Sequence, residues 1–189
     1  MAQIYPELSE ERLKALPSPA EATFYRTCRD SLDDEFLVVH SLCFVAPDRA
    51  MRPMDGETDF MLFHPTLGML IVELKGGGIR YDAQTGTWYS TDRRGHEHKI
   101  HDPLKQATRQ KHAMYGHLCK TAGRLGMRLP QIARGHAVFL PNVDDVAPSV
   151  SFAKEHFGFT EEMAADGFVS LSRPDVGFTL IFLRSGLAS

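Results

Sequence analysis

Two short apolar runs near the middle of the chain predict a pair of antiparallel strands. They cover residues 59–63 and 69–75, and the segment between them, HPTLG, contains a proline and a glycine that favour a turn. A hairpin closed by this loop places Asp59 opposite Glu73, where directly opposed side chains have Cβ atoms roughly 4.5 to 5.5 Å apart. The pattern therefore predicts two carboxylates close together at the end of the hairpin.

The alternation of side chains along a strand predicts the two faces of this hairpin. In the same register Phe63 faces Met69, and Lys75 falls on the face of Glu73 because side chains alternate with a period of two. The other face carries apolar residues that would pack against a helix: Leu70, Val72 and Leu74. A slip of one residue would bury the charges and expose the leucines, so the apolar pattern supports this register.

The charged positions of the hairpin have two interpretations. Asp59 and Glu73 could lie solvated on the polar face of an ordinary hairpin, with Lys75 screening them. Large apolar residues share that face, however, and predict that it is largely covered: Met61, Phe63, Met69 and Ile71. Charged residues are seldom buried unless they are paired or bound to a metal. A functional site is therefore the favoured interpretation.

Patterns on both sides of the hairpin predict further helices and strands. Helices are expected over residues 9–16, from Ser18 with Pro19 in the first position, from Asp102-Pro103 to about Ala122, and over residues 159–165. Strands are expected over residues 35–46, 79–81, 87–90, 136–140 and 178–182, with a loop over residues 48–55. This order predicts an α/β sandwich with a mixed sheet.

Composition and charge change this picture in three ways. A chain of 189 residues with 43% hydrophobic and 24% charged residues can bury one core, so we expect a single domain over residues 1–189. The net charge of −3 provides no global attraction for nucleic acid, so a binding surface must be local. Three widely spaced cysteines, no membrane-length apolar run and no signal-peptide pattern predict a cytoplasmic protein without membrane association.

Two polar residues outside the hairpin are candidates for the same site. Glu21 lies on the inward stripe of the predicted second helix, where its carboxylate could reach a metal. Alternatively, Ser18 and Glu21 have the spacing of a capping box, in which Glu21 would bond the backbone of Ser18. Gln106 lies in the first turn of the long helix, with Gln110 one turn on. A glutamine there could orient an attacking water or a carboxylate, although an exposed helix glutamine is the commoner explanation.

The string GETDF…GMLIVELKGGGIRYD…WY…DPLKQA resembles the nuclease-related domain (NERD) family, a branch of the PD-(D/E)XK nuclease superfamily, over roughly residues 18–140. The resemblance implies a restriction-endonuclease-like core with a mixed central β-sheet flanked by helices, and residues 141–189 as a C-terminal elaboration. It implies a catalytic core with two supporting members: Asp59, Glu73 and Lys75, with Glu21 and Gln106. It also implies a divalent metal, usually Mg²⁺. The usual proline before the aspartate is replaced by Thr58.

Physical chemistry explains why these residue types belong together. Two carboxylates about 5 Å apart repel by roughly 3 kcal/mol at an effective dielectric constant of about 20, and a divalent cation turns that repulsion into a binding site. Mg²⁺, or Mn²⁺ in its place, would be held by Asp59, Glu73 and the carbonyl of Leu74, with Glu21 as a further candidate ligand. Lys75 would orient or deprotonate the attacking water, or stabilise charge on phosphorus. The expected reaction is phosphodiester hydrolysis in nucleic acid, with DNA favoured.

Basic residues near the predicted site are candidates for contacts with phosphate groups: Arg80, Lys105, Arg109 and Lys111. Solvated surface positions are expected for at least half of the basic residues in this region.

Other functions remain open. The domain could be a catalytically inactive module that binds nucleic acid or a partner such as a helicase-like protein, or a structural domain in which Glu73 and Lys75 form only an ion pair. His96, His98 and His101 make a zinc site conceivable, but no fourth ligand at a diagnostic spacing accompanies them, so surface histidines are favoured.

Overall fold

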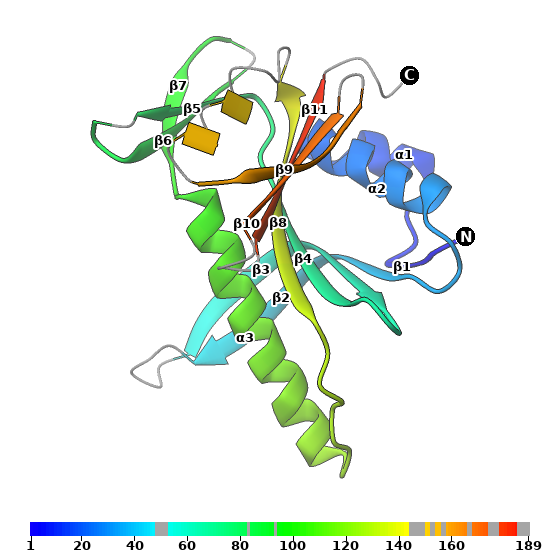
Figure 1. Ribbon diagram of the computed structural model, residues 1–189. Helices are drawn as coiled ribbons and strands as arrows, with labels where there is room; N and C mark the ends of the chain where they lie inside the picture. The colour runs from blue at the N-terminus through cyan, green and yellow to red at the C-terminus, as the bar shows by residue number, and fades with distance from the viewer. Residues whose placement is uncertain are drawn as a thin grey trace.

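A mixed sheet of eight strands forms the centre of the computed structural model (Figure 1). The structure describes residues 1–47, 53–82, 84–92, 94–143, 150–151, 154–155, 158–165, 168–173 and 178–184. In chain order the elements are β1 (Gln3–Tyr5), α1 (Glu10–Lys14), α2 (Pro19–Ser31), β2 (Leu37–Pro47), β3 (Pro53–His64), β4 (Gly68–Leu74), β5 (Gly78–Asp82), β6 (Thr87–Thr91), β7 (Glu97–Ile100), α3 (Pro103–Arg124), β8 (Arg134–Val143), β9 (Thr160–Ala165), β10 (Phe168–Arg173) and β11 (Phe178–Arg184).

The strand order in the large sheet is β1-β2-β3-β4-β8-β11-β10-β9. Strands β2, β3 and β4 are antiparallel neighbours, whereas β8 runs parallel to both β4 and β11. Strands β5, β6 and β7 form a separate small sheet near the amino-terminal end of α3 (Figure 1). The fold is therefore α/β with a mixed central sheet, as predicted, and is consistent with a restriction-endonuclease-like core. None of the helices in the described ranges is long and apolar enough to cross a membrane.

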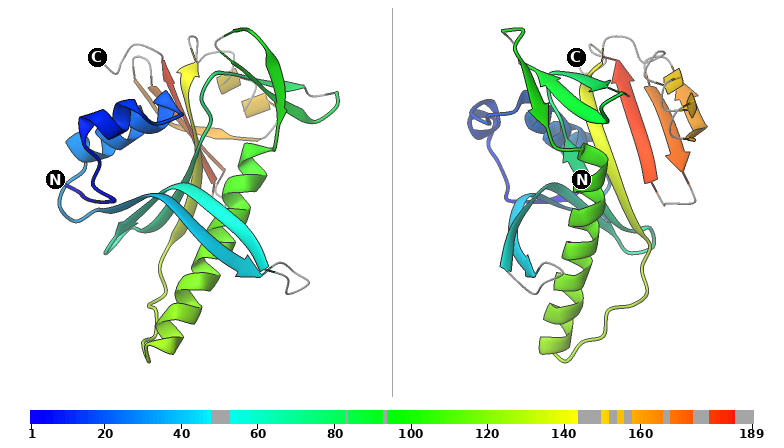
Figure 2. Two further views of the ribbon diagram at one scale, coloured as in Figure 1. Left: turned by 180° about the vertical axis from the view of Figure 1, so that it is seen from behind. Right: turned by 90° about the vertical axis from the view of Figure 1, so that its left-hand side faces the viewer.

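The helices cover opposite faces of the sheet, with α1 and α2 on one side and α3 on the other (Figure 2). On the first side, Tyr25 and Cys28 of α2 belong to one buried cluster with residues of the sheet that include Phe60, Val72 and Leu74. On the other side, Met114 of α3 packs with three sheet residues: Met61, Met69 and Ile71. These two clusters confirm the predicted faces of the central hairpin.

The β3–β4 hairpin has the predicted register. Its strands pair from His64 with Gly68 through Phe63 with Met69 to Phe60 with Val72. Gly68 has a φ of +94°, and a Cβ added there would lie 2.2 Å from the carbonyl oxygen of Ala133. Only glycine fits this position, because both the backbone conformation and the close approach exclude a side chain.

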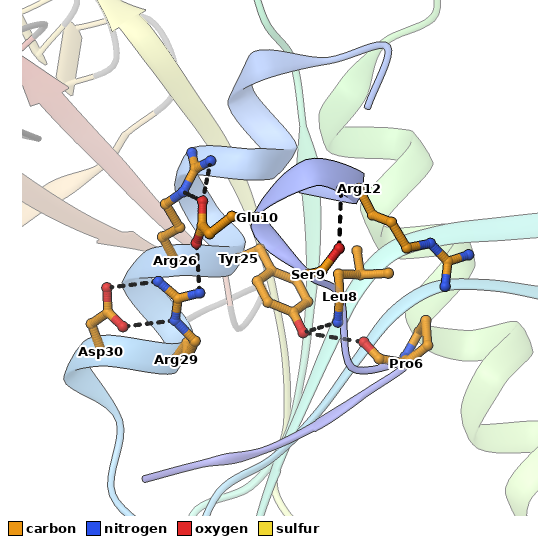
Figure 3. A network of polar contacts seen from close by, with 9 residues as sticks. All are labelled: Pro6, Leu8, Ser9, Glu10, Arg12, Tyr25, Arg26, Arg29 and Asp30. Atoms are coloured by element: carbon orange, nitrogen blue, oxygen red, sulfur yellow. Dashed lines mark hydrogen bonds and ion pairs between the residues drawn. The ribbon is translucent and has the colours of Figure 1, made fainter. Parts of the chain in front are cut away.

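A polar network fixes α1 and the amino-terminal segment against α2 (Figure 3). The carboxylate of Glu10 accepts hydrogen bonds from Arg26 and Arg29, at distances of 2.8 to 3.1 Å. The hydroxyl of Tyr25 accepts from the backbone N–H of Leu8 at 2.9 Å and donates to the carbonyl of Pro6 at 3.2 Å. These contacts hold α1 and the amino-terminal segment against α2, the helix whose first turn carries Glu21.

The C-terminal region departs from the prediction. The helix expected over residues 159–165 is wrong, because residues 160–165 form β9 and pair with β10, which was not predicted. Glutamate, methionine and alanine favour helices, but pairing with a neighbouring strand overrides this preference. An Asp-Gly dipeptide separates the two strands in the sequence, and this hairpin signal could have revealed them.

Two smaller differences concern loops and edges. The loop expected over residues 48–55 is shorter than predicted at its end, since β3 begins at Pro53, and residues 48–52 lie outside the described residues. The short strands β1 and β7 were not predicted. Each has only three or four residues, too few for a pattern of alternation to stand out.

Candidate active site

Strands β3 and β4 separate at the end opposite their turn. Their pairing stops at Phe60 and Val72, one position before Asp59 and Glu73. There the backbone N–H of Leu74 donates to Oδ2 of Asp59 at 2.7 Å, and the N–H of Lys75 donates to a carbonyl of β8 at 3.1 Å. Asp59 and Glu73 therefore lie at a fork in the sheet, where β4 leaves β3 and continues beside β8.

The neighbouring strand β2 also changes its course beside Asp59. The register pairs His40 with Phe60 and Leu42 with Thr58 but skips Ser41, which faces Asp59 and has a φ of +54°. A positive φ is uncommon for a residue other than glycine. Val39 and Leu42 pack in one cluster although regular alternation would put them on opposite faces. The side chains of β2 therefore change faces at Ser41, where the strand is kinked. Asp59 lies opposite this kink on β3.

Glu73 is buried, and both of its carboxylate oxygens have partners. The residue is 1% exposed. Nζ of Lys75 donates to Oε1 at 2.5 Å, and Nε2 of Gln110, on α3, donates to Oε2 at 2.8 Å. Gln110 is itself buried, and its amide also donates to the carbonyl of Glu57 at 2.7 Å. The Glu73 carboxylate is thus held by an ammonium group at one oxygen and by an amide group at the other.

The carboxyl group of Asp59 has a pKa well above the ordinary value of an aspartate. Burial and the negative charge of Glu73 raise the pKa of Asp59 to about 7, against the lowering effects of the Leu74 N–H and the Lys75 ammonium. The carboxyl group is therefore poised to lose its proton near neutral pH when a cation approaches, since a positive charge favours the ionised form.

Glu21 does not cap its helix. The side chain of Ser18 makes no capping hydrogen bond, and Oε2 of Glu21 lies 3.1 Å from Nε2 of His40, a buried residue of β2. The capping-box interpretation is therefore wrong. The charge of Glu21 contributes to raising the pKa of Asp59, so Glu21 lies within electrostatic range of the fork. Its role as a metal ligand stays a prediction.

The glutamine that contacts Glu73 is Gln110, which lies on α3 one turn beyond Gln106. Gln106 is partly buried, and its predicted role stays a prediction. Positions four apart share one face of a helix, so this spacing was the available signal for Gln110. Which of the two glutamines meets Glu73 depends on where α3 lies along β4, and the sequence pattern carries no such information.

The candidate phosphate contacts differ in accessibility. Lys105 and Arg109 are exposed on α3. Arg80 is exposed, but it is already bound through two nitrogens to Glu97, at 2.7 and 2.8 Å. Lys111 is only 8% exposed, and burial, together with the charge of Arg134, lowers its pKa. Lys105 and Arg109 are therefore the most accessible of the four.

The three histidines of the rival zinc site are exposed, as predicted. His96 and His98 each lie 3.4 Å from the same oxygen of Asp92.

Within the described ranges, donor atoms are spaced to share a cation at Asp33, Glu35 and His64. Nδ1 of His64 accepts two backbone N–H groups, at 3.2 Å each, so its proton lies on Nε2, the nitrogen that faces Glu35. A protonated nitrogen cannot ligate a metal. We therefore assign no metal to this surface group.

The groups around the fork fit a hard divalent cation. Asp59, Glu73 and the carbonyl of Leu74 are oxygen donors, the type that Mg²⁺ prefers. Among the described residues, Oε1 of Gln110 and Oγ1 of Thr58 are buried and without a hydrogen-bond partner. Gln110 contacts Glu73, and Thr58 precedes Asp59 in the chain. The unpaired oxygen of Gln110, beside Glu73, suits a water of the kind that Mg²⁺ retains. Thr58 and Asp59 are consecutive in β3, so their side chains point to opposite faces of the sheet.

Comparison with known proteins addresses the same part of the chain. No match was found among the curated proteins or the solved structures. The family model of the nuclease-related domain matches residues 17–141, about two thirds of the chain. This range includes α2, the fork between β3 and β4, and α3 with Gln110. The chain therefore belongs to the nuclease-related domain (NERD) family.

Proposed function

We propose that this protein is a metal-dependent nuclease of the PD-(D/E)XK type that hydrolyses phosphodiester bonds in nucleic acid, with DNA as the favoured substrate. The observation that carries the proposal is the fork itself. Asp59 bonds the backbone of Leu74, and the side chains of Glu73 and Lys75 meet at 2.5 Å. This is the set of groups that a nuclease of this family needs in one place.

Each residue at the fork has a role in this proposal. Asp59, Glu73 and the carbonyl of Leu74 would hold Mg²⁺, for which Mn²⁺ would substitute, and Glu21 is a further candidate ligand. The bound cation would polarise a phosphate oxygen and lower the pKa of a bound water. Lys75 has a side chain 23% exposed, against 1% for Glu73, so incoming substrate can reach Lys75 more readily than Glu73. It would orient the attacking water or stabilise charge on phosphorus.

The substrate would be held by local charge. The protein has a net charge of −3, so a nucleic acid must be attracted by particular basic residues rather than by the whole surface. Lys105 and Arg109 are exposed on α3, the helix that also carries Gln110. Binding through these residues would weaken as salt concentration rises, because phosphate contacts release condensed counterions.

Cleavage of circular and linear DNA with Mg²⁺ or Mn²⁺ tests the proposal. Glu73→Ala and Lys75→Ala should each lower the rate at least about 10³-fold, or about 4 kcal/mol of transition-state stabilisation. Glu11→Ala removes an exposed carboxylate on α1 and serves as the matched control, with unchanged cleavage expected. Circular dichroism establishes that the variants are folded. Absence of cleavage by the wild type on any DNA or RNA, together with absence of metal binding by calorimetry, would overturn the proposal.

An inactive binding module is the second candidate function. One observation favours it: Lys75 and Gln110 supply hydrogen-bond partners to both carboxylate oxygens of Glu73. In that case the fork would be a buried structural network, and the domain would bind nucleic acid or a helicase-like partner. Binding of DNA by the wild type that needs no metal and is unchanged in Glu73→Ala would favour this function over the nuclease.

A further inference from the structure

We propose that Gln110 is the positioning residue of the metal site, holding Glu73 with its amide nitrogen and a metal-bound water with its amide oxygen. The inference rests on the proposed nuclease function and adds a residue to its site. The resemblance to the family implied Gln106 for a supporting role, whereas the hydrogen bonds of the structure involve Gln110.

The orientation of the Gln110 amide follows from its neighbours. Its two contacts are with oxygen atoms that can only accept: the carboxylate oxygen of Glu73 at 2.8 Å and the carbonyl oxygen of Glu57 at 2.7 Å. A glutamine has two N–H donors on one atom and an acceptor on the other, so the nitrogen must face both oxygens. Exchanging the two ends of the amide would place oxygen against oxygen twice. The position of Oε1 is therefore determined by the contacts of Nε2.

The remaining atom, Oε1, needs a donor. Gln110 is 6% exposed, and Oε1 has no hydrogen-bond partner among the described residues. Buried carbonyl oxygens are nearly always paired, and an unpaired one destabilises the fold. Neither protein neighbour of the amide can supply the donor, because both are acceptors.

A water bound to a divalent cation meets this requirement. Such a cation at Asp59 and Glu73 would keep several of its waters, and each water donates hydrogen bonds outward. Gln110 contacts Glu73 directly, so Oε1 of the same amide lies close to that carboxylate. Gln110 would thus act through its neighbours: it is not a ligand, and it fixes both a ligand and a water. Partners of metal ligands commonly contribute in this way.

Gln84 provides the matched control. It is exposed in the turn between β5 and β6 and is not among the residues assigned to the site. Methionine has a similar length and no amide, so Gln110→Met and Gln84→Met remove the same group at a buried and at an exposed position.

Binding of Mn²⁺ measured by calorimetry tests the assignment. Gln110→Met should weaken binding by about 10- to 100-fold, the usual effect of removing a partner of a metal ligand. Gln84→Met should change it by less than about twofold, as for a substitution away from the site. Thermal unfolding is recorded in parallel, because a purely structural role of Gln110 would lower the melting temperature and leave the Mn²⁺ affinity of the folded protein unchanged.

A measurement on the wild type covers the case in which Gln110→Met does not fold. Side-chain amide signals of glutamines can be followed by nuclear magnetic resonance during titration with Mg²⁺. The Gln110 signals should shift on saturation, and those of the exposed Gln84 should shift much less. The reverse order of shifts, or equal Mn²⁺ affinity for wild type and Gln110→Met, would overturn this inference while leaving the nuclease proposal intact. A wild type that binds no metal would overturn both.

Discussion

The two ends of the β3–β4 hairpin serve different purposes. From the turn to Phe60 and Val72 the strands are fully paired, and the buried residues are apolar, with Ile71 at 0% exposure. Beyond that point the pairing stops, and Asp59 and Glu73 take up hydrogen bonds from backbone and side chains instead. We call the paired end at the turn the closed end and the unpaired end beyond Phe60 and Val72 the open end. The closed end holds apolar core residues, and the open end holds charged groups.

Within one hairpin, the residues that stabilise the fold and the residues expected to bind metal lie only a few positions apart, and we expect their substitution to have separate effects. Substitutions at the closed end should change the free energy of unfolding, because they remove buried apolar contacts. Substitutions at the open end should change metal binding and cleavage, because the groups there are buried against their electrostatic preference.

Asp59→Asn should have the largest effect, a loss of cleavage without destabilisation of the fold near neutral pH. The asparagine keeps the size of the aspartate and can still accept the Leu74 N–H through its carbonyl, but it removes a negatively charged ligand. Cleavage should fall by about 10³-fold or more, equivalent to about 4 kcal/mol. Urea unfolding should show a stability equal to or above that of the wild type near neutral pH. A variant that cuts at the wild-type rate would remove Asp59 from the site.

Ile71→Ala should produce the opposite result. The residue is fully buried between the sheet and α3, so its truncation should lower the free energy of unfolding by about 2 to 5 kcal/mol. Cleavage per folded molecule, measured well below the melting temperature, should be unchanged. Ile71→Val, expected to cost about 0.5 to 1.5 kcal/mol, is the control for cavity size. A loss of cleavage that parallels the loss of stability would show that the two ends are coupled.

The pH dependence of stability should reveal two groups, Asp59 and His136, whose pKa values are shifted in opposite directions. Asp59 has a pKa raised to about 7, so the folded protein binds its proton more tightly than the unfolded chain does. On that account the free energy of unfolding should rise as pH falls from about 7 towards 4. Burial, with the charges of Lys111 and His112, lowers the pKa of His136 to about 4, so this group should lower stability as pH falls from about 6.5 towards 4.

The two contributions should largely cancel in the metal-free wild type. Each amounts to roughly 2 to 4 kcal/mol when complete. Asp59→Asn should expose the histidine contribution, with stability lost on acidification, whereas His136→Gln should expose the aspartate contribution, with stability gained. Unfolding in urea across this pH range measures both slopes. Equal slopes in the two variants would contradict the assignment of the shifts.

The smallest effects are expected at Ser41. Ser41→Gly should change stability by no more than about 1 kcal/mol, because glycine relieves the positive φ but loses the 3.0 Å hydrogen bond to Glu57. Ser41→Val should cost more, since a β-branched residue adopts a positive φ poorly. If the kink positions Asp59, Mn²⁺ affinity should also fall in Ser41→Val and be kept in Ser41→Gly. Equal affinities in both variants would limit Ser41 to a role in stability.

Local pattern was sufficient to predict the hairpin, its register and the placing of Asp59, Glu73 and Lys75, because all of these follow from alternation over a short stretch. Contacts between distant parts of the chain were not predictable in the same way. Gln110 meets Glu73 across 37 positions, and the partner of Glu21 is a histidine on another strand. The helix wrongly expected at residues 159–165 has the same cause, since its strand exists through pairing with β10.

The order of strands in the sheet also has a consequence for how the chain folds. Strands β3 and β4 are joined by a short turn, whereas β4 pairs with β8 only after about 60 residues that form the small sheet and α3. Closing a long loop costs more conformational entropy and slows folding, so we expect the hairpin to form early and β8 to dock late. Glu73 pairs with Val138 of β8, so on this order it would gain its full burial only at that late step. A nascent or partly folded chain would therefore hold the two carboxylates without the complete site, and the proposed cleavage of nucleic acid would be possible only in the finished fold.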